Sequence, residues 1–321
     1  MVNTLIQVEH LSRTYGSLQA VNSINFELSQ GEVLGFLGPN GAGKSTTMQM
    51  ITGNLAPSQG RIKICGIDLL EQPKLAKAEI GYLPEQPPLY RELTVDEYLQ
   101  FAARINRIAR NKVATVVDRA KQRCGLEQTG KRLINNLSKG YQQRVGIAQA
   151  IIHSPSIVVL DEPTVGLDPI QIREIRDLIL ELGKEHGVIL STHILPEVQM
   201  TCDRVQIISQ GQLVYADRIE NLNQRMQATS LVIGLQNSPM TDALAAIDQV
   251  DAIDDLGDGR WRIHYQPENS PAEILVTQAV EYNWGLYELT PEYKSLEQIF
   301  VDITTAEQMH SQQLNLEEQV A

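Results

Sequence analysis

Cysteine is scarce in this 321-residue sequence. The three cysteines, Cys65, Cys124 and Cys202, lie far apart and form no C-x-x-C pair. This spacing fits neither a zinc site nor a disulfide framework. We therefore expect three free thiols.

The sequence also lacks a long apolar run and an excess of basic residues. No stretch stays apolar long enough to span a bilayer, and the start, Met1-Val2-Asn3-Thr4, lacks the basic and apolar regions of a signal peptide. Its 39 acidic residues outnumber its 27 lysines and arginines, giving a formal net charge of −12. Because nucleic-acid binders normally present a basic face, we expect no nucleic-acid partner. We expect the chain to stay in the cytoplasm.

The length and a change of pattern along the chain indicate two domains. Residues 1–220 mix strand and helix patterns, and the polar stretch 221–229 is predicted to be a linker. We expect a second domain at 221–305 and a polar tail at 306–321. The second domain has the order strand, helix, strand, strand, helix, strand, which is that of the ferredoxin-like fold. These elements and a last helix are expected at 230–235, 240–249, 250–256, 260–265, 271–282, 286–289 and 296–304.

The first domain has the pattern of an α/β fold with a helical insertion. Residues 1–31 alternate apolar and polar side chains, which predicts antiparallel strands. The runs 32–37 and 157–160 are mostly apolar, as in parallel strands covered on both faces. From about 87 to 153 the pattern becomes helical. Apolar residues recur there at spacings of three and four, at Val95, Tyr98, Leu99, Ala102, Ile105 and Ile108.

A glycine-rich stretch between the predicted strand 32–37 and a predicted helix at 46–51 is the most informative motif. It fits G-x-x-x-x-G-K-S/T, in which backbone N–H groups and a helix N-terminus bind phosphate. Lys44 should then reach the β- and γ-phosphates, and the Ser45 hydroxyl should bind Mg²⁺. A glycine-rich turn without function is the alternative, and the flanking strand and helix argue against it. The motif comprises Gly38, Pro39, Asn40, Gly41, Ala42, Gly43, Lys44, Ser45 and Thr46.

Polar side chains follow two further predicted strands. Asp161 and Glu162 follow the strand 157–160, and the carboxyl ends of parallel strands meet at the ligand-binding edge of a doubly wound sheet. We expect Asp161 to hold Mg²⁺ through water and Glu162 to polarise the attacking water. His193, after the strand 188–190, can donate to the γ-phosphate or orient that water. Exposed strand-end residues of no function are the alternative, which the upstream phosphate loop disfavours.

Two more polar positions fit a nucleotide site. Gln86 follows a short predicted strand, and its amide can bind Mg²⁺ or the attacking water. Ser138 precedes a predicted helix at 139–153, where serine is a good N-cap. Its hydroxyl and the free N–H groups of the helix start also form an anion site, with a plain helix cap as the alternative. Since the phosphate loop already holds one nucleotide, a second anion site suggests that Ser138 serves the nucleotide of another subunit.

Seven motifs thus occur in order along about the first two-thirds of the chain. They are Tyr15, Gly38–Thr46, Gln86, Leu137–Gln142, Ile157–Pro163, Val165–Asp168 and His193. This set resembles the ATP-binding subunit of ABC transporters. The resemblance implies the P-loop NTPase fold of ABC ATPases, with a RecA-like core, an antiparallel β subdomain and a helical subdomain. It also implies ATP and Mg²⁺ as cofactors, and ATP hydrolysis coupled to transmembrane transport.

The resemblance further implies a homodimer whose subunits lie head to tail around two ATP molecules. Each ATP would lie between the phosphate loop of one subunit and Ser138 and Gly140 of the other, which contact the γ-phosphate in the family. Tyr15 would stack on adenine, and Asp168 would lie in the loop that links the two sites. From the residues alone, ordinary strand packing is the alternative for Tyr15.

The signature motif departs from the commonest one of the family. This chain has Leu-Ser-Lys-Gly-Tyr at 137–141 where Leu-Ser-Gly-Gly-Gln is commonest. Such variants, the stretch Tyr82–Gln86 and the extra C-terminal domain are similar to export-type ABC ATPases, closest to those of gliding-motility and multidrug-export systems. The resemblance therefore implies export through transmembrane permease subunits, which would hold the chain on the inner face of the cell membrane. We expect the permease to dock on the helical insertion and the turn at 86–90.

Two other classes of function remain as alternatives. A soluble ABC ATPase acting on nucleic acid or the ribosome usually has two cassettes, a coiled coil or a zinc site, and none is visible in the sequence. An ATP-dependent assembly factor with little turnover would need neither Glu162 nor His193. Both alternatives are therefore weaker than a transporter subunit.

Overall fold

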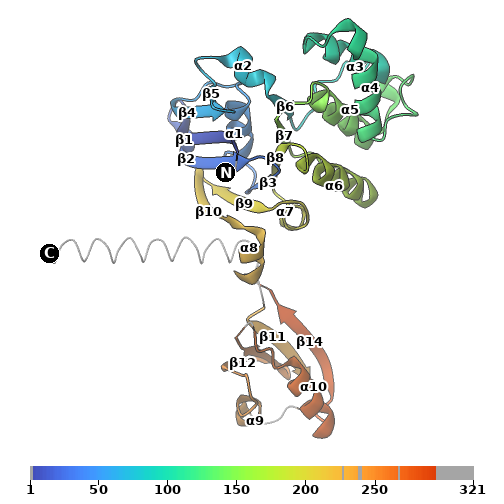
Figure 1. Cartoon of the computed structure of the whole chain (residues 1–321). Coiled ribbons are helices and arrows are strands. Elements are labelled where there is room, and N and C mark those ends of the chain that lie inside the picture. Colours follow the sequence, from blue (N-terminus) through green and yellow to red (C-terminus); the bar gives the residue numbers. More distant parts are fainter. Residues whose placement is uncertain (1–2, 226–227, 238–240, 267, 294–321) are drawn as a thin grey trace, which may run out of the picture. The chain divides into compact units, whose positions relative to one another are not determined.

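The computed structural model describes residues 3–225, 228–237, 241–266 and 268–293 (Figure 1). The chain divides into two compact units between Ile219 and Glu220, and each unit is described by itself. The helix expected at 296–304 and the tail expected at 306–321 lie outside the described residues.

The first unit begins with an antiparallel sheet in the order β2-β1-β4-β5. Alternate residues of its two long strands are buried, as expected for strands with one face on a core. The antiparallel strands predicted before the phosphate loop are confirmed. The strands are β1 (Thr4–Tyr15), β2 (Leu18–Ser29), β4 (Gln59–Ile64) and β5 (Ile67–Asp68).

A six-stranded sheet in the order β10-β9-β3-β8-β7-β6 forms the centre of the first unit. Five of its strands are parallel, and the edge strand β10 runs antiparallel to β9. Every residue of β3 and β7 is buried, as expected for parallel strands covered on both faces. The strands are β3 (Val33–Leu37), β6 (Ile80–Leu83), β7 (Ile157–Asp161), β8 (Gly187–Thr192), β9 (Arg204–Ser209) and β10 (Gln212–Arg218). Helices of this part are α1 (Lys44–Ile51), α2 (Pro73–Ala78), α6 (Pro169–Gly183) and α7 (Leu195–Thr201).

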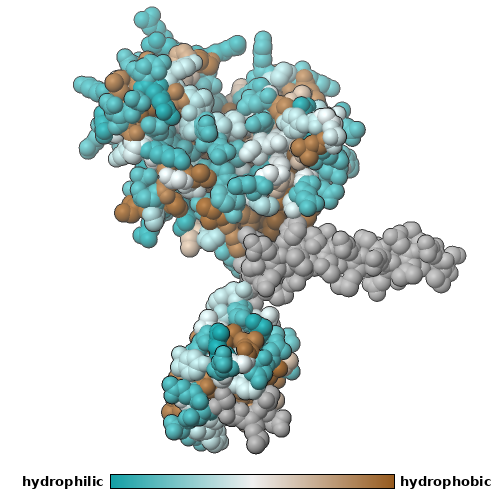
Figure 2. Space-filling model, turned by 180° about the vertical axis from the view of Figure 1, so that it is seen from behind, coloured by the Kyte–Doolittle hydropathy of each residue, from teal (hydrophilic) through white to brown (hydrophobic). Residues whose placement is uncertain are grey.

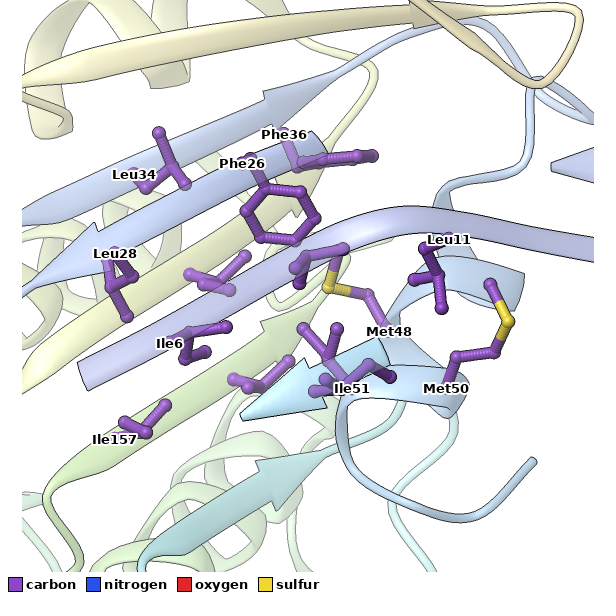
Figure 3. Close-up of a cluster of buried hydrophobic side chains, with 14 of the residues drawn as sticks. Ile6, Leu11, Phe26, Leu28, Leu34, Phe36, Met48, Met50, Ile51 and Ile157 are labelled. Atoms are coloured by element: carbon purple, nitrogen blue, oxygen red, sulfur yellow. The ribbon is translucent and has the colours of Figure 1, made fainter. Parts of the chain in front are cut away.

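A hydrophobic core joins the antiparallel sheet, the central sheet and helix α1 (Figure 3). The ring centroids of Phe26 in β2 and Phe36 in β3 lie 5.7 Å apart. Met48 and Ile51 of α1 are fully buried in the same cluster. Burial of each such side chain contributes about 1.5–3 kcal/mol. The strand before the phosphate loop and the helix after it are therefore both anchored, and the loop between them is held in place.

Three helices form the helical part of the first unit (Figure 1). The side chain of Thr94 caps the first of them in a capping box with Glu97. The predicted apolar face is buried as far as Ala102, but Ile105, predicted on the same face, is 62% exposed because the helix ends there. The elements are α3 (Val95–Ile105), η1 (Arg110–Lys112), α4 (Val113–Arg123), η2 (Ile134–Asn136) and α5 (Lys139–Ile151), where η denotes a 3₁₀ turn.

The second unit contains a four-stranded antiparallel sheet in the order β12-β13-β11-β14. Its core includes Leu244, Trp261 and Leu275, which come from a helix, a strand and a second helix. The described elements after residue 229 are β11 (Ser230–Leu235), α9 (Thr241–Ala245), β12 (Ala252–Gly257), β13 (Arg260–His264), α10 (Ala272–Glu281) and β14 (Leu286–Glu292).

Helix α8 (Ile219–Arg225) takes up much of the stretch expected to be a linker. Ile219 and Leu222 are buried, and residues three apart lie on the same face of a helix. The linker prediction is wrong for these residues, because two apolar side chains anchor a helix whose other residues are mostly polar.

In the part of the chain that the structure describes, no helix is long and apolar enough to cross a membrane. The face of the molecule in Figure 2 is mainly hydrophilic, with hydrophobic residues in small separate groups. Exposed apolar residues scattered in this way are usual on folded domains.

The three cysteines are free thiols, as predicted. Cys124 and Cys202 are buried. Burial raises the pKa of the Cys124 thiol to about 12, so this side chain stays protonated and unreactive near neutral pH.

Candidate active site

A cleft of about 470 Å³ lies at the carboxyl ends of β3, β7 and β8. Ligands of open α/β sheets bind at this edge. Three side chains from distant parts of the sequence line the cleft, namely Tyr15, Glu162 and His193. The phosphate loop contributes Asn40, Gly41, Gly43, Lys44, Ser45 and Thr46. The structure thus brings together residues that the sequence pattern assigns to one site.

The phosphate loop needs glycine at three positions. Gly41 and Gly43 have φ angles of +80° and +109°, which side chains disfavour. At Gly38 a Cβ atom would lie 2.3 Å from the carbonyl oxygen of Ile208, so glycine is needed for the loop to approach β9. The loop ends at the N-terminus of α1, whose free N–H groups and partial positive charge attract anions.

Lys44 lines the cleft although it is only 5% exposed. Its Nζ donates to the carbonyl oxygen of Gly38 at 2.8 Å and of Pro39 at 3.2 Å. The same nitrogen lies 3.3 Å from Oε1 of Glu162. Ala42 supports this arrangement, because its N–H donates to the Pro39 carbonyl at 3.2 Å. The ammonium charge is therefore fixed at the cleft, where the phosphates of a nucleotide can replace Glu162 as its anionic partner.

Asp161 and Ser45 place two oxygen ligands beside the phosphate loop. The Asp161 carboxylate accepts from the Ser191 hydroxyl at 2.7 Å and from the Ser45 hydroxyl. Burial raises the pKa of Asp161, the two hydroxyl groups oppose this, and nearby carboxylates add to it. A carboxylate and a hydroxyl are the hard oxygen ligands that suit Mg²⁺.

The donor set at this site is small. Among the described residues, no group of three or more His, Cys, Asp or Glu side chains could hold a metal ion. Mg²⁺ usually keeps several waters and is bound through one or two carboxylates together with substrate phosphates. The residues present therefore fit Mg²⁺ that arrives with a nucleotide.

Glu162 connects Lys44 to His193. Its Oε2 lies 2.9 Å from Nδ1 of His193, and an ionised carboxylate only accepts, so Nδ1 carries the proton. The backbone of Glu162 has a φ of +50°, a conformation that costs about 1–3 kcal/mol and is typical of functional sites. Its N–H donates to the Ser191 carbonyl oxygen at 2.9 Å, which holds this strained conformation. The carboxylate is thereby kept between a lysine and a histidine.

Tyr15 lies at the end of β1 and lines the cleft together with Leu18 and Ala20. Its side chain is 43% exposed. An exposed ring beside a phosphate loop is available for stacking on a nucleotide base.

Gln86, predicted to contact Mg²⁺ or the attacking water, does not line the cleft, and its neighbour Glu85 lines it instead. Gln86 is exposed. The chain bends at Glu85 and Gln86 after β6 ends at Leu83, so sequence position alone does not say which side chain faces the site. The role of Gln86 stays a prediction.

Sequence reasoning missed Glu85 and Ser191. The signal for Ser191 is its place near the end of β8, two residues before His193. Glu85 carries a weaker signal, because it lies two residues beyond the end of β6.

Ser138 and Gly140 lie at the start of α5 and do not line the cleft of their own chain. Ser138 is exposed, and its hydroxyl accepts from the Tyr141 N–H at 3.4 Å. A Cβ atom at Gly140 would lie 2.5 Å from Oε1 of Gln171 in α6. Asp168 caps α6 by accepting from the N–H groups of Ile170 and Gln171. The start of α5 therefore packs against the start of α6 and presents Ser138 outward.

Comparisons with known proteins identify this arrangement. Residues 21–165 match the family model described as ABC transporter. The bacitracin transport ATP-binding protein BcrA of Bacillus licheniformis is 34% identical over 309 residues, covering 94% of this chain and 98% of that protein. The chain belongs to the ABC transporter ATP-binding proteins.

Two further similarities agree with this family. The linearmycin resistance ATP-binding protein LnrL of Bacillus subtilis (strain 168) is 31% identical over 307 residues, covering 94% of this chain and 98% of that protein. The solved structure of cbiO1 from Clostridium perfringens, part of the ABC transporter complex cbiONQ, has a TM-score of 0.64 and 31% identity and covers 69% of this chain and 91% of that one. The chain therefore has the P-loop fold of an ABC ATPase, an ATP-hydrolysing enzyme, and its nucleotide is ATP.

Proposed function

We propose that this ABC ATPase powers an exporter, dimerising head to tail with a second copy around two ATP molecules and driving separate transmembrane permease subunits. It would then lie on the inner face of the cell membrane through the permease. The names of BcrA and LnrL, which mention bacitracin transport and linearmycin resistance, support export.

The main support for the dimer is that the two helix N-termini predicted to bind anions, those of α1 and α5, are separate. The start of α1 is in the cleft with Lys44, whereas Ser138 at the start of α5 is exposed and lines no part of that cleft. In a head-to-tail dimer, Ser138 and Gly140 of one copy would meet the ATP held by Lys44 of the other. Asp168, at the cap of α6 beside Gly140, would lie between the two sites.

The cleft supports defined roles in hydrolysis. Lys44 would bind the β- and γ-phosphates, and Ser45 and Asp161 would hold Mg²⁺, which neutralises charge on the phosphates. Once Lys44 exchanges Glu162 for phosphate, the Glu162 carboxylate is free to polarise the attacking water. His193, which already donates to Glu162, would orient this carboxylate and the γ-phosphate. We propose that Gln86 reaches the same site when ATP is bound.

We propose that the permease docks on the helical part of the first unit. Tyr90 is 48% exposed, and its ring lies 5.3 Å from that of Phe101. Phe101 and Ile105 add exposed apolar surface from α3, and Arg91 and Glu92 are exposed beside them. Apolar anchors with a polar rim are typical of protein interfaces.

Substitution of this surface by charge tests the docking proposal. Tyr90→Asp combined with Ile105→Asp should leave ATP hydrolysis by the isolated chain intact and reduce cosedimentation with membranes that contain the permease. Leu75→Asp is the matched control, because Leu75 is 57% exposed on α2, outside the helical part. Unchanged cosedimentation of the double variant would place the docking surface elsewhere and make the soluble ATPase and the assembly factor alternatives again.

We propose that the second unit is a ferredoxin-like accessory domain that contributes to dimer contact or regulation. Its order of elements and its antiparallel sheet support this assignment. It lacks a phosphate loop of its own.

A further inference from the structure

An arginine lies against the ring of Tyr15. The Cζ atom of Arg13 lies 4.7 Å from the ring centroid of Tyr15, within the range of a cation–π contact. Both residues belong to β1, whose pairing with β2 shifts register between Arg13 and Thr14. Tyr15 lines the cleft and Arg13 does not. The guanidinium group therefore lies over the ring from outside the cleft.

The guanidinium group is held there by the loop after α1. Its NH1 donates to the Ala56 carbonyl oxygen at 2.9 Å. The buried Nε has no hydrogen-bond partner among the described residues, and no carboxylate of the same residues forms an ion pair with Arg13. Among the described residues the positive charge is thus not neutralised by an acid, and it acts on the Tyr15 ring as well as on the Ala56 carbonyl.

A cation on one face of an aromatic ring changes what the other face can bind. The faces of two stacked rings are both electron-rich and repel each other when fully overlapped. A guanidinium group behind Tyr15 draws electron density away from the open face and also fixes the angle of the ring. Both effects favour a base stacked on the open face.

We infer that Arg13 is a positioning residue for the nucleotide base, acting only through Tyr15. The inference rests on the proposed binding of ATP in this cleft with adenine on Tyr15. Arg13 then contributes to the affinity for the base but not to the affinity for the phosphates, which Lys44 would bind.

The test measures the dissociation constants of ATP and of inorganic tripolyphosphate, each with Mg²⁺, by calorimetry on the full-length chain. Arg13→Gln removes the charge and keeps an amide N–H for the Ala56 carbonyl. The substitution should raise the dissociation constant of ATP about two- to fivefold, the range that corresponds to an exposed cation–π contact. The dissociation constant of tripolyphosphate, which has no base, should not change. In hydrolysis assays KM should rise and kcat should stay the same.

Three variants complete the design. Arg13→Lys keeps the charge and should recover much of the affinity for ATP. Arg61→Ala is the matched control, because Arg61 lies on β4 of the same sheet and pairs with Asp68 rather than with an aromatic ring; it should leave both constants unchanged. In a chain that already carries Tyr15→Ala, Arg13→Gln should have no further effect.

Three results would overturn the inference: unchanged ATP affinity in Arg13→Gln, an equal loss for tripolyphosphate, or the same loss in the Tyr15→Ala chain. Failure of the proposed function looks different. A wild-type chain that binds ATP without hydrolysing it would contradict the ATPase role, while the binding constants would still decide the role of Arg13. A chain that binds no ATP would contradict both.

Discussion

Helices α1 and α5 both begin at a motif that the sequence predicts to bind an anion, and the surroundings of the two helix N-termini differ. The start of α1 is enclosed by the strand ends, with Lys44 buried between the loop carbonyls and Glu162. The start of α5 presents Ser138 outward and packs on α6. At the N-terminus of α1, Lys44 contacts Glu162, which in turn contacts His193, whereas Ser138 of α5 has no such neighbours in the cleft. We propose that the second motif completes the ATP site of another copy of the chain.

The largest expected effect on ATP turnover is at the enclosed N-terminus of α1. Glu162→Gln keeps the size of the side chain but removes the carboxylate that would polarise water, so turnover should fall about 10²–10⁴-fold, with ATP binding retained. Steady-state ATPase rates and ATP affinity are the measurements. Glu85→Gln, at the other acidic side chain lining the cleft, is the control and should change the rate little. A Glu162→Gln chain with near-normal hydrolysis would remove Glu162 from the catalytic role.

The second prediction addresses the exposed N-terminus of α5. Ser138→Arg should leave ATP binding to the isolated chain unchanged, because Ser138 does not line its own cleft, and should impair hydrolysis. Mixing it with Lys44→Ala chains should give more activity than the two variants alone, since each mixed dimer contains one intact site. The mixed ATPase rate, compared with the sum of the two parents, is the measurement. Loss of ATP binding by the Ser138→Arg chain alone would show that the N-termini of α1 and α5 belong to one ATP site within one chain.

Much of the site around the N-terminus of α1 could be predicted from the sequence, because local features determine it. The apolar strands β3 and β7, the glycine loop and the polar residues at the strand ends are all visible as patterns. Other features depend on tertiary contacts. Which of Glu85 and Gln86 faces the cleft depends on a turn, and the exposure of Ile105 depends on where α3 ends. The contact of Arg13 with Tyr15 is set by a hydrogen bond to a distant loop.

The third prediction concerns the loop between β7 and α6, in which Glu162 lies beside Lys44 and Gly166 lies beside Lys139. Gly166 has a φ of +72°, and a Cβ atom there would lie 2.3 Å from Nζ of Lys139. Gly66 has a φ of +79° with open space around it. Alanine at either position should cost about 1 kcal/mol of stability, the penalty of the left-handed backbone. Gly166→Ala should also displace Lys139 and lower ATPase about fivefold, a part of what misplacing groups around a reacting centre can cost.

Thermal unfolding and ATPase rates of the two alanine variants are compared. Equal rates in Gly166→Ala and Gly66→Ala would show that the contact of Lys139 with this loop has no role in hydrolysis. A lower rate in Gly166→Ala at equal stability would support coupling between the start of α5 and the loop before α6.

The smallest effect on ATP affinity is expected from removal of the second unit beyond α8. Truncation after Arg225 keeps α8, whose Leu222 is fully buried, and removes no residue that lines the cleft. ATP affinity should stay within about twofold of the full chain, since the two units have separate cores, and dimerisation or its ATP dependence should change. Calorimetry and light scattering on both chains are the measurements. Loss of ATP binding in a still-folded truncated chain would contradict the assignment of the whole ATP site to the first unit.

The central proposal is that each ATP site is formed by two copies of this chain together. The mass of the complex with and without ATP tests this most directly. Light scattering of Glu162→Gln with Mg²⁺ and ATP should give a dimer, and the same chain without nucleotide should give a monomer. Adding Ser138→Arg to that chain should abolish the dimer while ATP still binds. A monomer at saturating ATP, or a dimer that is indifferent to both ATP and Ser138, would contradict the account.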